Sequence, residues 1–243
     1  MANRFVKVVP DPAAVATTAA KRIVDLADDA IATRGSFSIA LSGGSTPKTL
    51  FELLATEPYS KRIDWKNWRF YFGDERTVPP THSDSNFRMA SEAMLDKLAI
   101  PADHIHRMRG EIDPQESAKE YGELLKANFG DNGLDVILLG MGDDGHTASL
   151  FPNTAALSET KHRCVANHVE KLNTWRITMT APFINRARQI IVMATGANKA
   201  DRLHQVLDGP PDTRNLPIQM IDPPAGQALW LLDAPAAAKL ATN

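Results

Sequence analysis

The pattern of apolar and polar positions predicts strands and helices that follow one another along most of the chain. Apolar residues recur at helical spacing from residue 12 to 34, and Gly35 is expected to end that helix. The apolar run 37–41 then predicts a strand, and helical spacing resumes at Leu50. The same reasoning predicts strands at 68–72, 134–139, 163–166, 176–180, 189–194 and 228–232, and helices at 86–98, 114–129 and 197–207.

This order of elements indicates the fold class. Strands that alternate with helices, several of them unbroken apolar runs, are typical of a mostly parallel sheet covered by helices on both faces. No linker, repeat or low-complexity tract divides the sequence, so residues 1–243 are predicted to form a single α/β domain. Because ligands bind beyond the carboxyl ends of such strands, functional residues are expected in the loops after residues 41, 72, 139 and 194.

Composition excludes several classes of protein. The 243 residues are 43% hydrophobic and 23% charged, which excludes disordered and fibrous chains. Lys and Arg number 27 against 29 for Asp and Glu, and a net charge of −2 gives no general attraction to nucleic acid or an anionic membrane. With Cys164 as the single cysteine, no signal-peptide pattern and no long apolar stretch, we expect a cytoplasmic protein without disulfide, metal or membrane span.

The loop after the strand at 37–41 has the ingredients of an anion site. Glycines let the backbone approach a ligand closely, hydroxyls donate hydrogen bonds, and the next helix offers unpaired N–H groups. A phosphate would fit, although a plain turn with Ser45 or Thr46 as the helix cap explains the same residues. The residues concerned are Ser42, Gly43, Gly44, Ser45 and Thr46.

The loop at 140–146 carries candidate acid–base chemistry. It formally matches the dinucleotide fingerprint Gly-x-Gly-x-x-Gly, but it lies mid-chain and Pro152 follows too soon for the long helix that the fingerprint requires. Asp144 and His146 are two residues apart and converge if the turn is irregular. A neutral histidine beside a carboxylate that fixes its tautomer can accept a proton, so this pair is the candidate general base.

Two further charged groups follow predicted strands. Asp74 and Arg76 lie directly after the strand at 68–72, where a solvated strand end is the alternative interpretation. Lys199 lies at the start of the helix at 197–207, where it either complements a phosphate or faces solvent. We see no spacing of His, Cys, Asp or Glu that is typical of a metal site.

Taken together, five motifs resemble the 6-phosphogluconolactonase family. They occur in order from about residue 36 to 207, so the resemblance covers most of the chain. The motifs are Ser-Gly-Gly-Ser-Thr-Pro at 42–47, Phe-Gly-Asp-Glu-Arg-x-Val-Pro at 72–79, Ser-Asp-Ser-Asn-x-Arg at 83–88, Gly-Met-Gly-x-Asp-Gly-His-Thr-Ala-Ser-Leu-Phe-Pro at 140–152 and Arg-Ile-Thr-Met-Thr at 176–180.

The resemblance implies a fold, a substrate and a role for each candidate site residue. The fold would be the Rossmann-like sheet shared with glucosamine-6-phosphate deaminase and ribose-5-phosphate isomerase, without a nucleotide or other cofactor. The reaction would be hydrolysis of 6-phospho-D-glucono-1,5-lactone, with His146 as general base on water and Asp144 orienting it. The phosphate would bind the loop 42–46 with Arg76 and Lys199, and Asp74 would bind sugar hydroxyls or tune Arg76.

Two other functions remain as alternatives. Glucosamine-6-phosphate deaminase resembles the loop at 140–146 but carries a glutamate further along, where this sequence has Phe151. A non-catalytic sugar-phosphate sensor would keep the phosphate site, but it would be expected to carry a DNA-binding segment, and residues 1–35 show a single Ala-rich helix instead. A small-molecule substrate and a monomer or weak homo-oligomer are expected.

Overall fold

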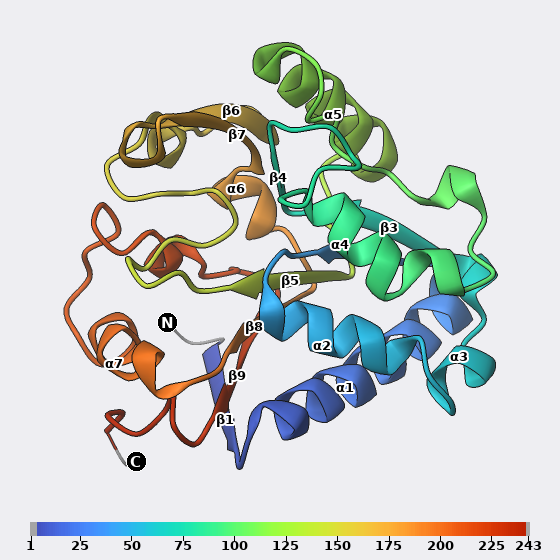
Figure 1. Ribbon diagram of the computed structural model, residues 1–243, viewed down its shortest axis with the longest axis horizontal. Helices are drawn as coiled ribbons and strands as arrows, with labels where there is room; N and C mark the ends of the chain where they lie inside the picture. Colours follow the sequence, from blue (N-terminus) through green and yellow to red (C-terminus); the bar gives the residue numbers. More distant parts are fainter. Residues whose placement is uncertain (1–3, 242–243) are drawn as a thin grey trace.

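The computed structural model describes residues 4–241 and contains two sheets (Figure 1). The main sheet has six strands in the order β1-β9-β8-β5-β2-β3, and every neighbouring pair is parallel. This confirms the predicted α/β class with a mostly parallel sheet. The strands are β1 (Arg4–Val9), β2 (Phe37–Leu41), β3 (Trp68–Phe72), β5 (Val136–Gly140), β8 (Gln189–Ala194) and β9 (Gln227–Asp233).

Helices cover both faces of this sheet, as Figure 1 shows. Along β5, alternate residues enter two separate cores: Val136 and Leu138 pack with α1 and α2, whereas Ile137 and Leu139 pack with α5 and α7. This period of two is what a strand buried on both faces requires. The helices are α1 (Pro12–Arg34), α2 (Ser45–Leu54), α3 (Tyr59–Arg62), α4 (Asn86–Ala93), α5 (Pro114–Phe129), α6 (Ala181–Ile184) and α7 (Ala200–Leu207).

The first helix shows how local sequence sets its ends. The side chain of Asp11 accepts a hydrogen bond from the N–H of Ala14 at 2.8 Å, and Pro12 follows at the first helical position. At the other end Gly35 adopts a φ of 79° and donates its N–H to Ile31. The predicted bounds of α1 are therefore confirmed.

A second, smaller sheet was not predicted. It is antiparallel, with the order β4-β7-β6, and consists of β4 (Asp74–Arg76), β7 (Thr174–Met179) and β6 (Cys164–Val169). The strands expected at 163–166 and 176–180 exist, but they form a hairpin in this sheet instead of joining the parallel one. The turn between them, residues 170–173, is too short for the crossover that parallel neighbours need.

Three other expectations need correction. The first strand, β1, was missed because its residues 5–8 are exposed at the sheet edge and show no alternation in burial. The helix expected at 86–98 ends at Ala93 and gives way to a 3₁₀ turn at 95–97. The helix expected at 197–207 likewise begins as a 3₁₀ turn before α7.

The small sheet faces the carboxyl ends of the main strands. The N–H of Gly73 donates to Leu41 in β2, and the carbonyl of Gly73 accepts from Met179 in β7. The chain thus passes directly from β3 into β4, and the loops after β2 and β5 meet the small sheet. None of the helices within residues 4–241 is long and apolar enough to cross a membrane.

Candidate active site

Two adjoining hollows lie where the carboxyl ends of the main strands meet the small sheet. The first has a volume of about 190 Å³ and includes the glycine loop after β2, and the second has about 340 Å³ and reaches the β6–β7 turn. Four residues line both hollows and therefore mark the junction between them. They are Asp74, Arg76, His146 and Ala148.

The structure brings Asp144 and His146 together as the sequence predicts. Asp144 Oδ1 lies 2.5 Å from His146 Nδ1 and also accepts the His146 backbone N–H at 3.2 Å. Burial raises the pKa of Asp144, but hydrogen bonds from His146 and Lys171 outweigh that effect, so its pKa lies well below the usual value and the group is ionised. An ionised acceptor at Nδ1 selects the tautomer with its proton on Nδ1, which leaves Nε2 as a proton acceptor.

The His146 ring lies in an irregular loop and packs on an aromatic side chain. No helix begins at this loop, because residues 141–154 form turns and an isolated bridge between Thr147 and Leu150. A helix dipole therefore does not act on the imidazole. The ring is instead stacked on Phe151, with centroids 4.1 Å apart.

Position 142 has no room for a side chain, because the His146 ring lies against Gly142. A Cβ at this position would be 2.1 Å from both Nδ1 and Cε1 of the imidazole, far inside contact distance.

We therefore predict that Gly142→Ala displaces the ring and lowers kcat at least tenfold, since about 1 Å of misplacement can cost roughly 10²-fold. The fold should survive, because only the end of a side chain has to move. Gly73→Ala is the matched control, because its added methyl would meet Leu41 O at an ordinary 3.6 Å. Equal kcat in the two variants would contradict this account of Gly142.

The glycine loop opens the N-terminus of α2. Gly44 is the cap residue and no side chain caps the helix, so the suggestion that Ser45 or Thr46 caps it is wrong. The first N–H groups of α2 are thereby left for another acceptor, as in an anion site. Ser42, Gly43 and Gly44 line the first hollow; Ser45 and Thr46 do not, and the Thr46 hydroxyl bonds that of Thr195 at 2.9 Å.

Asp74 is buried and holds three segments together. Its Oδ2 accepts from the Ser149 hydroxyl at 2.5 Å, and its Oδ1 accepts from the Asn86 amide at 3.2 Å. Asn86 in turn lies so close to Gly43 that a Cβ there would be 2.0 Å from its Oδ1. The carboxylate therefore joins β4 to the glycine loop and to the loop after β5, and Asn86 and Ser149 were missed because only the fold brings them here.

Glu75 lies between Asp74 and Arg76, and the alternative interpretation of this segment as a solvated strand end is wrong for it. It is 2% exposed, and its carboxylate accepts from the Ser85 hydroxyl at 3.1 Å and from the N–H groups of Asn86 and Phe87 at 2.7 and 2.8 Å. These donors form the start of α4, so Glu75 anchors this helix beside the site. Burial raises the pKa of Glu75, and the backbone N–H groups offset part of that rise.

The raised pKa of Glu75 gives a pH-dependent prediction for stability. A folded-state pKa above the unfolded value, about 4.3, means that the folded chain binds more protons, so Glu75 favours folding most at low pH. The free energy of unfolding of wild type minus that of Glu75→Gln should therefore shrink as pH rises through the raised pKa. Chemical denaturation at several pH values measures this difference, and a difference that grows with pH would refute the assignment.

Two arginines lie side by side on neighbouring strands of the small sheet. Arg76 in β4 and Arg176 in β7 are register partners, and both line the second hollow. Burial and the neighbouring Arg76 lower the pKa of Arg176, and neither arginine has a carboxylate within ion-pair distance among residues 4–241. Two adjacent guanidinium groups without an acidic partner suit a dianion.

Lys199 does not line either hollow. Its ammonium contacts Asp143 Oδ1 at 2.5 Å, and Asp143 lines the second hollow. The structure therefore places Lys199 behind an acidic side chain, next to the site but with its charge already paired.

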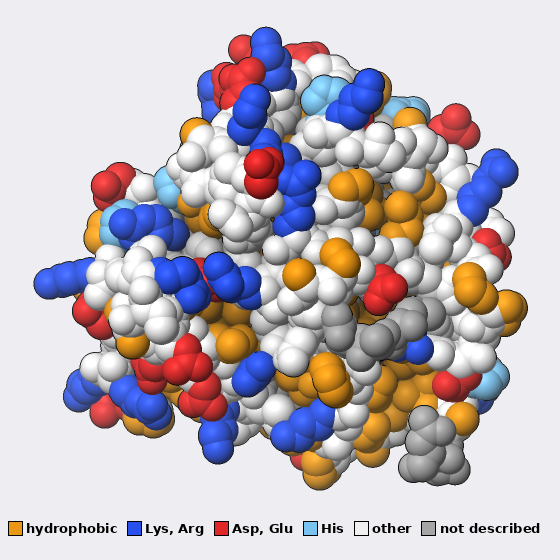
Figure 2. Space-filling view, turned by 180° about the vertical axis from the view of Figure 1, so that it is seen from behind, with side chains coloured by type: hydrophobic (Ala, Val, Ile, Leu, Met, Phe, Trp, Pro, Cys, Tyr) orange, Lys and Arg blue, Asp and Glu red, His pale blue; other side chains and the backbone are white. Residues whose placement is uncertain are grey.

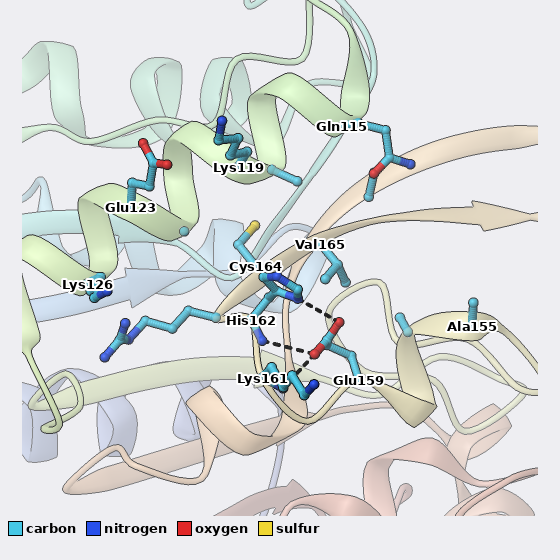
Figure 3. A pocket seen from close by; sticks show the side chains of 15 residues that line it. Gln115, Lys119, Glu123, Lys126, Ala155, Glu159, Lys161, His162, Cys164 and Val165 are labelled. Carbon is cyan, nitrogen blue, oxygen red and sulfur yellow. Dashed lines mark hydrogen bonds and ion pairs between the residues drawn. The ribbon is translucent and has the colours of Figure 1, made fainter.

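A larger hollow than either of these lies elsewhere, between α5 and β6 (Figure 3). Its volume is about 720 Å³, and its lining includes Cys164, His162 and Glu159. A cysteine, a histidine and an acidic residue together can form a nucleophilic site. Here burial raises the pKa of the Cys164 thiol, and the imidazole of His162 bonds Glu159 at 3.0 Å. An un-ionised thiol is a poor nucleophile, so we place the chemistry at the smaller pair of hollows.

Comparisons with known proteins show the family to which the chain belongs. The sequence model of a family described as glucosamine-6-phosphate isomerases/6-phosphogluconolactonase matches residues 10–230. A protein of Nostoc sp. named 6-phosphogluconolactonase is 43% identical over 244 residues, covering 98% of this chain and 99% of that one. The chain belongs to this family.

Solved structures with two different activities share the fold of this chain. The 6-phosphogluconolactonase of Trypanosoma brucei superposes with a TM-score of 0.86 and 30% identity, covering 98% of this chain and 99% of that one. A monomeric glucosamine-6-phosphate deaminase superposes almost as well, with a TM-score of 0.83, at 18% identity and with 97% and 99% coverage. Because the fold accommodates both activities, the choice between them depends on side chains.

Proposed function

We propose that this member of the family hydrolyses 6-phospho-D-glucono-1,5-lactone to 6-phospho-D-gluconate, as part of the pentose phosphate pathway. The observation that carries the proposal is the Asp144–His146 pair at the junction of two hollows, next to Arg76 and the glycine loop. Relatives named 6-phosphogluconolactonase support the reaction.

The imidazole is placed to activate water. With its Nδ1 proton directed at Asp144, His146 presents Nε2 to a water molecule that attacks C1 of the lactone. The proton taken from water then passes to the ring oxygen as the C1–O bond breaks, which opens the ring and yields the carboxylic acid. Asp144 stabilises the imidazolium that forms in between.

The phosphate serves as the handle for binding. We assign it to the open N-terminus of α2 with the loop 42–46, and to Arg76, which lines the same hollow. Arg176 adds a second guanidinium beside Arg76, whereas the ammonium of Lys199 is paired with Asp143 and would reach the phosphate only if that ion pair opened. The net charge of the chain is −2, and acidic and basic side chains are interspersed on the face drawn in Figure 2, so we assign the attraction of the dianion to the local pair of arginines.

Phe151 favours the lactonase over the deaminase. Ring-opening isomerisation of an amino sugar needs proton transfers beyond one general base, and the deaminase resemblance places a glutamate at this position. Here an apolar ring, 7% exposed, stacks on the imidazole and supplies no proton.

Parallel assays on two substrates test the proposal. The chain should accelerate loss of freshly generated phospholactone above its spontaneous rate, and it should release no ammonia from glucosamine 6-phosphate. Ammonia release with an unaccelerated lactone would identify a deaminase. Binding of sugar phosphates without either reaction would identify a sensor.

A further inference from the structure

The Asp144 carboxylate is shared between two groups. Its Oδ1 contacts His146 Nδ1, and its Oδ2 accepts a hydrogen bond from the ammonium of Lys171. Lys171 belongs to the turn at 170–172 between β6 and β7, so this contact ties the small sheet to the loop after β5. Neither the reaction nor the phosphate site described above uses Lys171.

We propose that Lys171 is a positioning residue that shares Asp144 with His146 and so keeps the imidazole unprotonated to lower pH than Asp144 alone would allow. This inference rests on the proposed function, because it concerns the same general base. It makes Lys171 a determinant of the pH range in which the site works.

The direction follows from electrostatics. A carboxylate beside an imidazole favours the charged imidazolium, which cannot accept a proton from water. A cation on the other carboxylate oxygen neutralises much of that charge and opposes protonation of the ring. The Lys171 side chain is 61% exposed, so solvent and salt weaken its effect but do not change the sign.

The contact also fixes the carboxylate in space. Asp144 lies in an irregular loop, and one hydrogen-bonded partner would leave its side chain free to rotate. With Oδ1 held by His146 and Oδ2 by Lys171, both oxygens are engaged and the imidazole orientation is set.

Other charged groups also face the imidazole and must stay constant in a test. Asp143 from the same loop, Asp74 and Arg76 from β4 and Arg176 from β7 line the second hollow, and Lys199 lies behind Asp143. Substitution at Lys171 leaves each of them in place, so a changed pH response reports on Lys171.

The test compares pH profiles of kcat/KM for Lys171→Gln and wild type. Loss of the ammonium should move the acid limb of the profile to higher pH by roughly half a unit or more. Lys171→Arg should keep the wild-type limb, because it keeps the charge. Lys126→Gln removes the same charge from an exposed position on α5 and should leave the limb unmoved.

Two outcomes of the pH-profile comparison would overturn the proposal. An unmoved limb with a raised KM would assign Lys171 to the substrate phosphate, and a loss of kcat at every pH with an unmoved limb would assign it a purely structural role. In the Asp144→Asn background, Lys171→Gln should shift nothing, because the shared carboxylate is gone. A shift of equal size there would also count against the proposal.

A measurement that needs no substrate tests this inference independently of the proposed function. Proton NMR of the His146 ring follows its protonation directly in the full chain. The midpoint should rise in Lys171→Gln whether or not the chain hydrolyses the lactone. An unmoved midpoint would refute the role of Lys171 even if the lactonase activity is present.

Discussion

Replacing His146 by alanine should lower kcat by roughly 10²- to 10⁴-fold, which is what a positioned general base typically supplies. The imidazole is the group at the junction of the two hollows whose geometry leaves a nitrogen free to accept a proton. KM should change little, because the phosphate contacts remain. Steady-state rates on freshly generated lactone, corrected for spontaneous hydrolysis, measure the effect.

The control for this variant is its stability. His146 is partly exposed, with 28% of its side chain accessible, and its loss removes the stacking on Phe151 without opening the core. The melting temperature should therefore stay close to that of wild type. A folded His146→Ala variant with wild-type kcat would show that another group activates the water.

Arg76→Ala should act mainly on KM. A hydrogen bond to a charged group contributes about 1.5–3 kcal/mol, which corresponds to a rise of roughly 10- to 100-fold in KM for the phosphorylated lactone. The unphosphorylated lactone should be unaffected, because it lacks the group that Arg76 binds. Comparing KM for the two lactones isolates this contribution.

Arg88→Ala provides the matched control for Arg76. Arg88 lies on α4, where its guanidinium bonds Glu92 at 2.6 Å and the carbonyl of Thr81 at 2.9 Å, and it lines neither hollow. Its removal should leave KM near the wild-type value. Equal increases in KM for Arg76→Ala and Arg88→Ala would mean that Arg76 has no specific contact with the phosphate.

Sequence patterns predicted the main sheet well, because strands buried on both faces show continuous apolar runs. They failed at β1, whose exposed edge position removes the burial signal, and at β4, whose three charged residues look like a solvent-facing loop. Burial of Glu75 depends on the backbone donors of α4, which only the folded chain brings beside it.

For the site, local spacing was enough to predict the contact between Asp144 and His146, because both lie in one turn. Contacts between distant segments were not predictable in this way. The position of Arg176 beside Arg76 depends on the β4–β7 register. The contact of Lys171 with Asp144 depends on the packing of the β6–β7 turn against the loop after β5.

The most direct test of the central claim is to follow freshly generated 6-phospho-D-glucono-1,5-lactone by NMR with and without catalytic amounts of the chain. We predict that the lactone is converted to 6-phospho-D-gluconate at a rate proportional to the amount of protein and well above the spontaneous rate. Loss of the lactone at the spontaneous rate, whatever the protein concentration, would contradict the account.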